Sequence, residues 1–325
     1  MNILEIKDLV VEYRIPEGIV RAIDNIDLFV KKGEVLAVVG ESGSGKSTLA
    51  YSIVRLLPRN ARIVKGSIIF NTGNESIDLV KVPENIIRSL RGYKIGVVFQ
   101  DPMTFLNPVM KIEDQIIEAM LTHRDISRDE ARNKVINILK RLRIPNPEYI
   151  ARSYPHQLSG GMKQRVMIAM AIANEPDLLI ADEPTSALDV TVQAEILNLF
   201  KYLQEEMDLS IILITHDLGV AARIADRIAI MYAGKVVEVG DVEEVFHDPL
   251  HPYTQGLLGS ILTIEERSFS KGYVLRGLPP NMINPPRGCR FHPRCPYIMK
   301  GKCEIYEPHL INLGGRYVAC WLYER

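Results

Sequence analysis

Leu158-Ser-Gly-Gly-Met-Lys-Gln-Arg165 is the stretch that decides the fold of this chain, because of what precedes and follows it. A glycine-rich loop that fits a phosphate-binding pattern lies upstream, at residues 40–48. An apolar run that ends in two carboxylates follows, at residues 178–183. Many proteins carry such a loop, but few follow it with a Leu-Ser-Gly-Gly run that opens a helix before an acidic strand end. The order of these features predicts an α/β fold built around a nucleotide.

Length and composition limit the class of protein. The chain has 325 residues, of which 24% are charged and 47% hydrophobic, as in an ordinary globular protein with one sizeable domain and an appendage. A formal net charge of −1 gives no electrostatic reason to expect nucleic acid as a partner. No apolar run approaches the roughly 20 residues that cross a bilayer, and the first residues do not resemble an export signal. We expect a cytoplasmic protein that reaches any membrane through a partner.

Residues 1–240 and residues 241–325 differ in composition, which predicts two regions. The first region alternates short β-rich runs with helical patterns, as in βαβ units with a mostly parallel sheet. Its buried strands are expected at residues 35–39, 95–99, 178–181, 211–215 and 228–232. Residues 3–13 and 23–30 suggest an antiparallel flap over this sheet, and residues 232–239 suggest a hairpin that turns at Gly234.

Residues 101–165 have a helical pattern, which predicts a helical subdomain inserted into the sheet domain. Ser127 and Glu130 are spaced as a capping box. One helical face follows the box and consists of Ala131, Val135, Ile138, Leu139 and Leu142.

Gly40-Glu-Ser-Gly-Ser-Gly-Lys-Ser-Thr48 fits the pattern G-x-x-x-x-G-K-[ST] directly after an expected strand. Its glycines let backbone N–H groups turn inward around phosphate oxygens, and the following helix adds partial positive charge. Lys46 is placed to reach the β and γ phosphates, and Ser47 to ligate Mg²⁺. A Gly- and Ser-rich surface turn, the alternative, does not require this strand and helix. The expected nucleotide ligands are Gly40, Ser42, Gly43, Ser44, Gly45, Lys46, Ser47 and Thr48.

Leu178-Leu-Ile-Ala-Asp-Glu183 places two carboxylates at the end of an expected strand. Ligands of open α/β sheets gather at the carboxyl ends of strands. Asp182 is therefore expected to hold Mg²⁺, directly or through water, and Glu183 to act as general base on the attacking water. A simple helix cap is the alternative, because Asp-Glu-Pro-Thr can start a helix by itself.

Gln100 and His216 follow two further expected strands. The Gln100 carbonyl is a candidate Mg²⁺ ligand, and its amide a sensor of the γ phosphate. His216 is a candidate donor to the same phosphate. Taken singly, each is an ordinary polar residue, but both are expected at the sheet edge that carries the phosphate loop.

These features together resemble the ATP-binding-cassette (ABC) ATPases. The phosphate loop, Gln100, the run 158–165, Asp182-Glu183, Ser186-Ala-Leu-Asp189 and His216 match the motifs of that family in order, over residues 1 to about 240. The resemblance places Tyr13 where the family has an aromatic residue that stacks on adenine, although a strand tyrosine is equally suited to packing.

The resemblance also implies that two ATPase subunits sandwich two ATP molecules head to tail. Ser159, Gly160 and Gly161 open a helix, so their N–H groups and hydroxyl form a second anion site. In ABC ATPases that site faces the γ phosphate held by the partner subunit. ATP then favours the closed dimer, and hydrolysis removes the contacts that held it closed.

The tail, residues 241–325, resembles one group of ABC ATPases. His251-Pro-Tyr-Thr254 with Leu257-Leu258 is similar to the C-terminal region of dipeptide and oligopeptide importer ATPases, and residues 100–108 resemble that group except at Phe105, where Ser is more usual. Nickel importers share much of this pattern. Non-transport ABC proteins that act on DNA or ribosomes carry long coiled coils or two cassettes, which this sequence lacks, and the run 158–165 argues against a P-loop kinase.

The resemblance implies several partners and a location. We expect an ATPase at the cytoplasmic face of the membrane that works with a second ATPase subunit, either identical or paralogous. Two permease subunits and, indirectly, an extracellular peptide-binding protein complete the expected assembly.

Cys289, Cys295, Cys303 and Cys320 all lie in one 32-residue stretch, which predicts a single four-thiolate site. Their spacing differs from the paired C-x₂-C of structural zinc, and cytosolic proteins rarely keep disulfides. With its C-x₅-C-x₇-C pattern and a later cysteine, the tail resembles that of peptide-importer ATPases with a [4Fe–4S] cluster. The resemblance therefore implies such a cluster here, with zinc and unligated thiols as alternatives. Five cations suit an anionic cluster, namely Arg287, Arg290, Arg294, Lys300 and Lys302.

Overall fold

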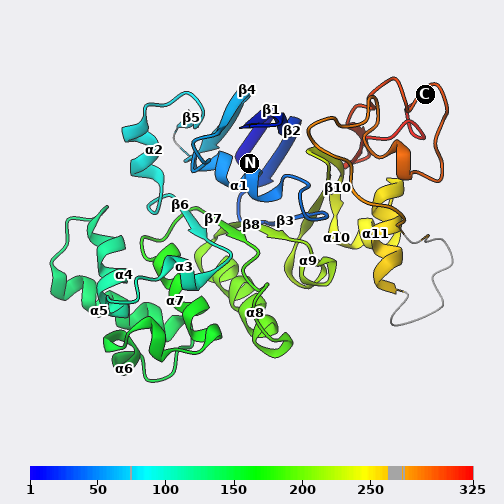
Figure 1. The fold of residues 1–325 in the computed structure, drawn as a ribbon. Helices are drawn as coiled ribbons and strands as arrows, with labels where there is room; N and C mark the ends of the chain where they lie inside the picture. The colour runs from blue at the N-terminus through cyan, green and yellow to red at the C-terminus, as the bar shows by residue number, and fades with distance from the viewer. Residues whose placement is uncertain (74, 263–272, 274, 325) are drawn as a thin grey trace.

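The computed structural model describes residues 1–73, 75–262, 273 and 275–324, and its strands form two sheets (Figure 1). The smaller sheet is antiparallel, in the order β2-β1-β4-β5. Its strands are β1 (Asn2–Ile15), β2 (Gly18–Lys31), β4 (Ala61–Asn71) and β5 (Ser76–Asp78). It corresponds to the predicted antiparallel flap, with two strands that the sequence patterns did not indicate.

The larger sheet has a parallel centre in the order β9-β3-β8-β7-β6. These strands are β3 (Val35–Val39), β6 (Ile95–Val98), β7 (Leu178–Asp182), β8 (Ser210–Thr215) and β9 (Arg227–Tyr232). The predicted parallel sheet is therefore confirmed. Because side chains alternate between the faces of a strand, Ala37 and Leu213 enter one core, while Leu36 and Ile212 enter the other.

Helices and the small sheet cover the two faces of the large sheet. One core is shared with the antiparallel sheet and with α1 (Lys46–Ile53) and α2 (Glu84–Leu90). The opposite core is shared with α7 (Gly160–Ile172), α8 (Val190–Met207) and α9 (Leu218–Ile224). The carboxyl ends of β3, β8, β7 and β6 consequently lie side by side at one edge of a covered sheet.

The predicted helical segment lies between β6 and β7, at the opposite end of the molecule from the tail in Figure 1. It contains α3 (Pro102–Phe105), α4 (Ile112–Leu121), α5 (Arg128–Arg141), α6 (Pro147–Arg152) and η1 (Pro155–Gln157). The capping box of α5 is confirmed, because Ser127 Oγ accepts the Glu130 N–H and Glu130 Oε2 accepts the Ser127 N–H. The predicted face is buried except at Ile138, which is half-buried.

The tail continues the large sheet instead of building a sheet of its own. After β10 (Lys235–Asp241), it contains α10 (Val242–His247), α11 (Pro252–Leu262), η2 (His292–Arg294), β11 (Ile311–Leu313) and β12 (Arg316–Val318). Strand β12 pairs with β10, and β11 with β12. The ring of Tyr232 lies 4.6 Å from that of Tyr253 and 5.2 Å from that of Phe291, so the tail shares the core of the sheet domain.

The hairpin at Gly234 is confirmed, since Tyr232 pairs with Lys235 across Ala233 and Gly234, both at positive φ. Among the described residues, no helix is both long enough and apolar enough to cross a membrane.

Candidate functional site

The phosphate loop connects the buried strand β3 to α1 and is closed over the Lys46 side chain. The Lys46 ammonium donates hydrogen bonds to the carbonyl oxygens of Gly40, at 2.7 Å, and Glu41, at 3.1 Å. Burial lowers the pKa of Lys46, although nearby carboxylates act in the opposite direction. Gly45 precedes the helix at a φ of 104°, which glycine adopts without strain. The loop therefore lies between a buried strand and a helix, as its sequence predicted.

Gly40 approaches β9 so closely that Gly40→Ala is expected to destabilise the protein. A Cβ at this position would lie 2.1 Å from the carbonyl oxygen of Met231, so the backbone would have to move. We expect the free energy of unfolding to fall by about 1–3 kcal/mol, the usual range for overpacking, as measured by urea denaturation. Gly160→Ala is the control, because a Cβ there meets only Leu188 at 3.7 Å. Equal losses in both variants would contradict the steric argument.

Asp182 and Ser47 meet at the end of β7. Ser47 Oγ donates to Asp182 Oδ1 at 3.0 Å, and Asp182 is buried. Burial raises the pKa of Asp182, and the hydroxyls of Tyr51 and Ser47 partly offset this. Asp182 Oδ2 and Ser44 Oγ are buried without a hydrogen-bond partner in the described part of the chain. Because buried polar atoms are normally paired, these two fit a ligand that carries phosphate oxygens and Mg²⁺.

The Glu183 side chain follows β7 and contacts residues that follow the two neighbouring strands, β6 and β8. Its carboxylate accepts a hydrogen bond from Gln100 Nε2 at 3.1 Å and lies 3.1 Å from Nδ1 of His216. The structure therefore brings together the three residues that were predicted at separate strand ends. Glu183 also has a φ of 46°, a strained conformation for a residue with a side chain and one common at functional sites. Its N–H, donated to Ile214 O at 2.9 Å, holds that conformation.

Ser159, Gly160 and Gly161 lie at the start of α7, as predicted. Ser159 is the N-cap, and its hydroxyl accepts the Met162 N–H at 3.4 Å. Ser159 and Gly160 are exposed. Helix α7 packs against β6 and against α3, α4, α5 and α8, whereas α1 packs against β2, β7 and β8. The Leu-Ser-Gly-Gly run and the phosphate loop thus open helices that pack on opposite faces of the large sheet.

Tyr13 connects the antiparallel sheet to the phosphate loop. Its hydroxyl lies 3.1 Å from Thr48 Oγ1, in the first turn of α1. This contact places the phenol close to the predicted nucleotide site. Stacking of Tyr13 on adenine stays a prediction.

The family described as "ABC transporter" matches residues 23–186, about half of the chain, which include the phosphate loop, Glu183 and the Leu-Ser-Gly-Gly run. This chain belongs to the ABC transporter family. A second family, described as "Oligopeptide/dipeptide transporter, C-terminal region", matches residues 237–303 of this ABC protein.

Curated relatives extend the similarity over the full chain. The oligopeptide transport ATP-binding protein OppD of Bacillus subtilis is 48% identical, over 99% of this chain and 89% of its own length. The dipeptide transport ATP-binding protein DppD of the same organism is 45% identical, over 100% of this chain and 96% of its own length. OppD of Escherichia coli is 43% identical, over 98% of this chain and 93% of its own length.

Solved structures share the fold of this ABC protein. The dimeric structure of MJ0796, a bacterial ABC transporter cassette, has a TM-score of 0.65 and 31% identity, and the match covers 74% of this chain and 98% of that one. CbiO1 from Clostridium perfringens, part of the ABC transporter complex cbiONQ, has a TM-score of 0.64 and 31% identity. The match covers 81% of this chain and 95% of that one.

The four cysteines of this ABC protein line one small pocket. Each sulfur accepts a backbone N–H. The donor is Phe291 for Cys289, Tyr297 for Cys295, Met299 for Cys303 and Leu322 for Cys320. Burial raises the pKa of Cys289 to about 12 and that of Cys320 to about 11, and the neighbouring thiols add to this. Cys289 and Cys320 consequently keep their protons at neutral pH.

The structure does not place the four cysteines as a group that could hold a metal ion. Within the ranges that the structure describes, no group of three or more His, Cys, Asp or Glu side chains is placed to hold a metal ion. Burial favours the protonated form of Cys289 and Cys320, and only the thiolate binds a metal, so a metal would have to displace these protons. The described residues therefore show no assembled site for the predicted [4Fe–4S] cluster or for zinc.

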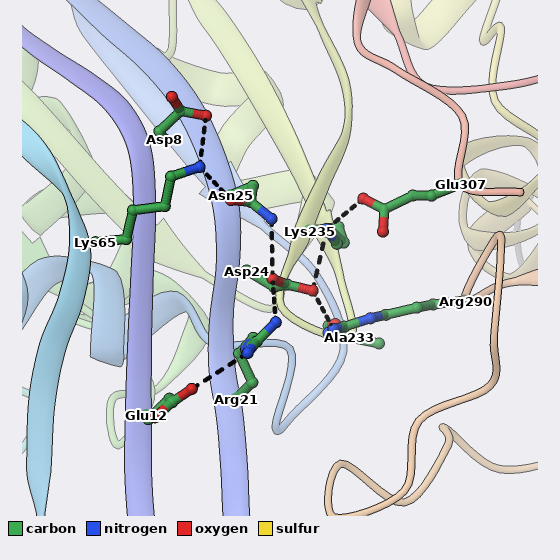
Figure 2. A network of polar contacts seen from close by, with 10 residues as sticks. All are labelled: Asp8, Glu12, Arg21, Asp24, Asn25, Lys65, Ala233, Lys235, Arg290 and Glu307. Carbon is green, nitrogen blue, oxygen red and sulfur yellow. Dashed lines mark hydrogen bonds and ion pairs between the residues drawn. The ribbon is translucent and has the colours of Figure 1, made fainter.

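Several cations assigned to the cluster have other partners, which corrects that prediction. Figure 2 shows Arg290 extending from the tail to Asp24 of β2 and to the carbonyl of Ala233, next to the Lys235–Glu307 pair. Lys302 lies 4.2 Å from the ring of Trp321. Their charges are therefore engaged by groups other than the thiols.

Sequence reasoning missed how the tail reaches the phosphate loop. Arg294 donates to both carboxylate oxygens of Glu41, at 2.8 and 3.1 Å. The Glu41 N–H donates to the Tyr253 hydroxyl at 3.0 Å. Tyr253 lies in the run 251–254 that marked the tail, but the pattern carried no information about its partner. Tyr51, beside Asp182, also had no sequence signal.

Proposed function

We propose that this chain is the ATP-hydrolysing subunit of an importer of di- or oligopeptides. The observation that carries the proposal is the junction of Lys46, Ser47, Asp182 and Glu183 at one sheet edge of an ABC protein. The curated relatives described above have oligopeptide or dipeptide transport in their names, which favours peptides over nickel. The match of the tail to the oligopeptide/dipeptide C-terminal region also speaks against a non-transport ABC protein.

Each residue of the site has a proposed role. Lys46 exchanges its carbonyl partners for the β and γ phosphates, which the loop glycines and hydroxyls surround. Ser47 and Asp182, with Gln100, would hold Mg²⁺, which neutralises phosphate charge when bound. Glu183 accepts a proton from the attacking water, and His216 donates a hydrogen bond to the γ phosphate.

Two ATPase subunits are needed for a complete site. Ser159, Gly160 and Gly161 start a helix of 13 residues and are accessible, so their N–H groups suit the γ phosphate bound by a partner subunit. One solved relative is titled a dimeric, post-hydrolysis state bound to ADP and Pi. We propose the same head-to-tail pairing here, with an identical or paralogous chain.

The permease is proposed to dock beside α3. Met103, Phe105 and Val109 expose 64%, 47% and 80% of their surface. An apolar group of this kind on the surface suits contact with another protein. Docking on two permease subunits would place the chain at the cytoplasmic face of the membrane, and couple it indirectly to an extracellular peptide-binding protein.

A [4Fe–4S] cluster is proposed for the tail, with zinc as the alternative. In support, the four sulfurs line one pocket and each accepts a backbone N–H, which stabilises thiolates and cluster sulfurs alike. The raised pKa values mean that a metal must displace the thiol protons on binding.

Deleting the gene is expected to abolish uptake of radiolabelled trialanine and to leave uptake of ⁶³Ni²⁺ unchanged. The wild-type gene should restore peptide uptake, whereas Lys46→Ala, which removes the phosphate-binding ammonium, should not. Loss of nickel uptake with intact peptide uptake would contradict the proposed substrate.

A further inference from the structure

Glu41 places a carboxylate within the phosphate loop. It is the second residue of the loop, and its carbonyl oxygen is one of the two that Lys46 holds. A free carboxylate at this position would repel the phosphates of a nucleotide and weaken its binding. The loop therefore requires a cation that cancels this charge.

Arg294 of the tail is that cation. Its guanidinium binds both Glu41 oxygens, a geometry that fixes the carboxylate and that a lysine cannot reproduce. The Arg294 side chain is 7% exposed. Two further donors are also used, by the Arg276 carbonyl at 2.9 Å and the Tyr232 hydroxyl at 3.3 Å. The guanidinium is thus held in place independently of Glu41.

Tyr253 holds the backbone of the same residue. Its hydroxyl accepts the Glu41 N–H, and its ring is fully buried between Tyr232 and Phe291. Side chain and backbone of Glu41 are therefore both anchored by tail residues. Arg294 directly precedes Cys295. The conformation of the cysteine segment therefore positions the residue that binds Glu41 of the phosphate loop.

We propose that Arg294 and Tyr253 are positioning residues for ATP binding, and that Arg294 acts by cancelling the charge of Glu41. The inference rests on the proposed ATP site and goes beyond it, because it makes nucleotide affinity depend on the tail. A tail that is disordered around its cysteines would leave Glu41 uncompensated and bind ATP less tightly.

Three variants test the charge argument, with the dissociation constant of AMP-PNP measured on the full chain by calorimetry in low salt. Arg294→Gln should weaken binding about tenfold, and the double variant Arg294→Gln with Glu41→Gln should recover to within about threefold of the wild type. Arg294→Lys keeps the charge and should lose less than about threefold. The defect of Arg294→Gln should diminish as salt is added.

Arg316→Gln is the matched control. Arg316 is another poorly exposed tail arginine, and it pairs with Glu238 and Asp248, neither of which belongs to the loop. Its loss should lower the melting temperature without changing nucleotide affinity. The inference is overturned if Arg294→Gln binds as tightly as the wild type, if Glu41→Gln does not rescue it, or if Arg316→Gln weakens binding equally. A wild-type chain that binds no nucleotide would instead refute the proposed function.

Discussion

Glu183→Gln should lower the rate of ATP hydrolysis about 10²–10⁴-fold, the scale of a lost general base. The amide retains the shape of the carboxylate but cannot accept the proton of the attacking water. Lys46, Ser47 and Asp182 are unchanged, so ATP should still bind, and slow hydrolysis should leave a stable ATP-bound dimer. Phosphate release at saturating ATP measures the first effect, and light scattering after gel filtration with ATP and Mg²⁺ measures the second.

Glu205→Gln provides the control for this substitution. Glu205 is exposed near the C-terminal end of α8 and is not one of the site residues, so its change should leave both turnover and dimerisation as in the wild type. A Glu183→Gln protein that hydrolyses ATP normally, and does not dimerise with it, would remove Glu183 from the role proposed here.

Protein purified without oxygen should be brown and contain about four iron atoms and four sulfides per chain, as a [4Fe–4S] cluster requires. Because the thiols share one pocket and each accepts an N–H, ligand binding there would order the cysteine segment. Removing the cluster should therefore lower the melting temperature. Iron and sulfide analysis, with the visible absorption spectrum, measures the first expectation, and thermal unfolding before and after chelation measures the second.

Two substitutions in the same pocket sharpen this test. Cys295→Ser removes one ligand with little change in volume and should lose most of the iron. Met299→Leu also alters a residue that lines the pocket, but spares the four thiols and should retain the iron. A colourless protein with bound zinc would reject the cluster, and a metal-free protein whose stability is unaffected by Cys295→Ser would favour unligated thiols.

Local patterns in the sequence were sufficient for much of the fold and for the position of the candidate nucleotide site. The loop 40–48 takes its shape because glycines, a preceding apolar strand and a following helix are all chain neighbours. The capping box at Ser127 and the turn at Gly234 are equally local, since their geometry involves three or four consecutive residues. Glu183, Gln100 and His216 were found indirectly, because parallel strands place their carboxyl ends at one edge.

Contacts between distant parts of the chain were decided by tertiary structure alone. Arg294 and Glu41 are 253 residues apart, and no periodicity relates the two positions. The same holds for Arg290, which was assigned to a cluster from its place among the cysteines but pairs with Asp24 in β2. A charge in a sequence has no defined partner until the backbone is placed, because charge pairing depends on distance and burial.

The sequence by itself thus determined an ABC ATPase, since the Leu-Ser-Gly-Gly run and the phosphate loop are short motifs with intrinsic geometry. The tertiary structure decided how the tail is used. It merges β12 into the main sheet, gathers four thiols in one pocket without forming a metal site, and holds the phosphate loop through Glu41. The physical reason is that a motif encodes the shape of its own backbone, whereas packing brings together residues whose separation along the chain carries no signal.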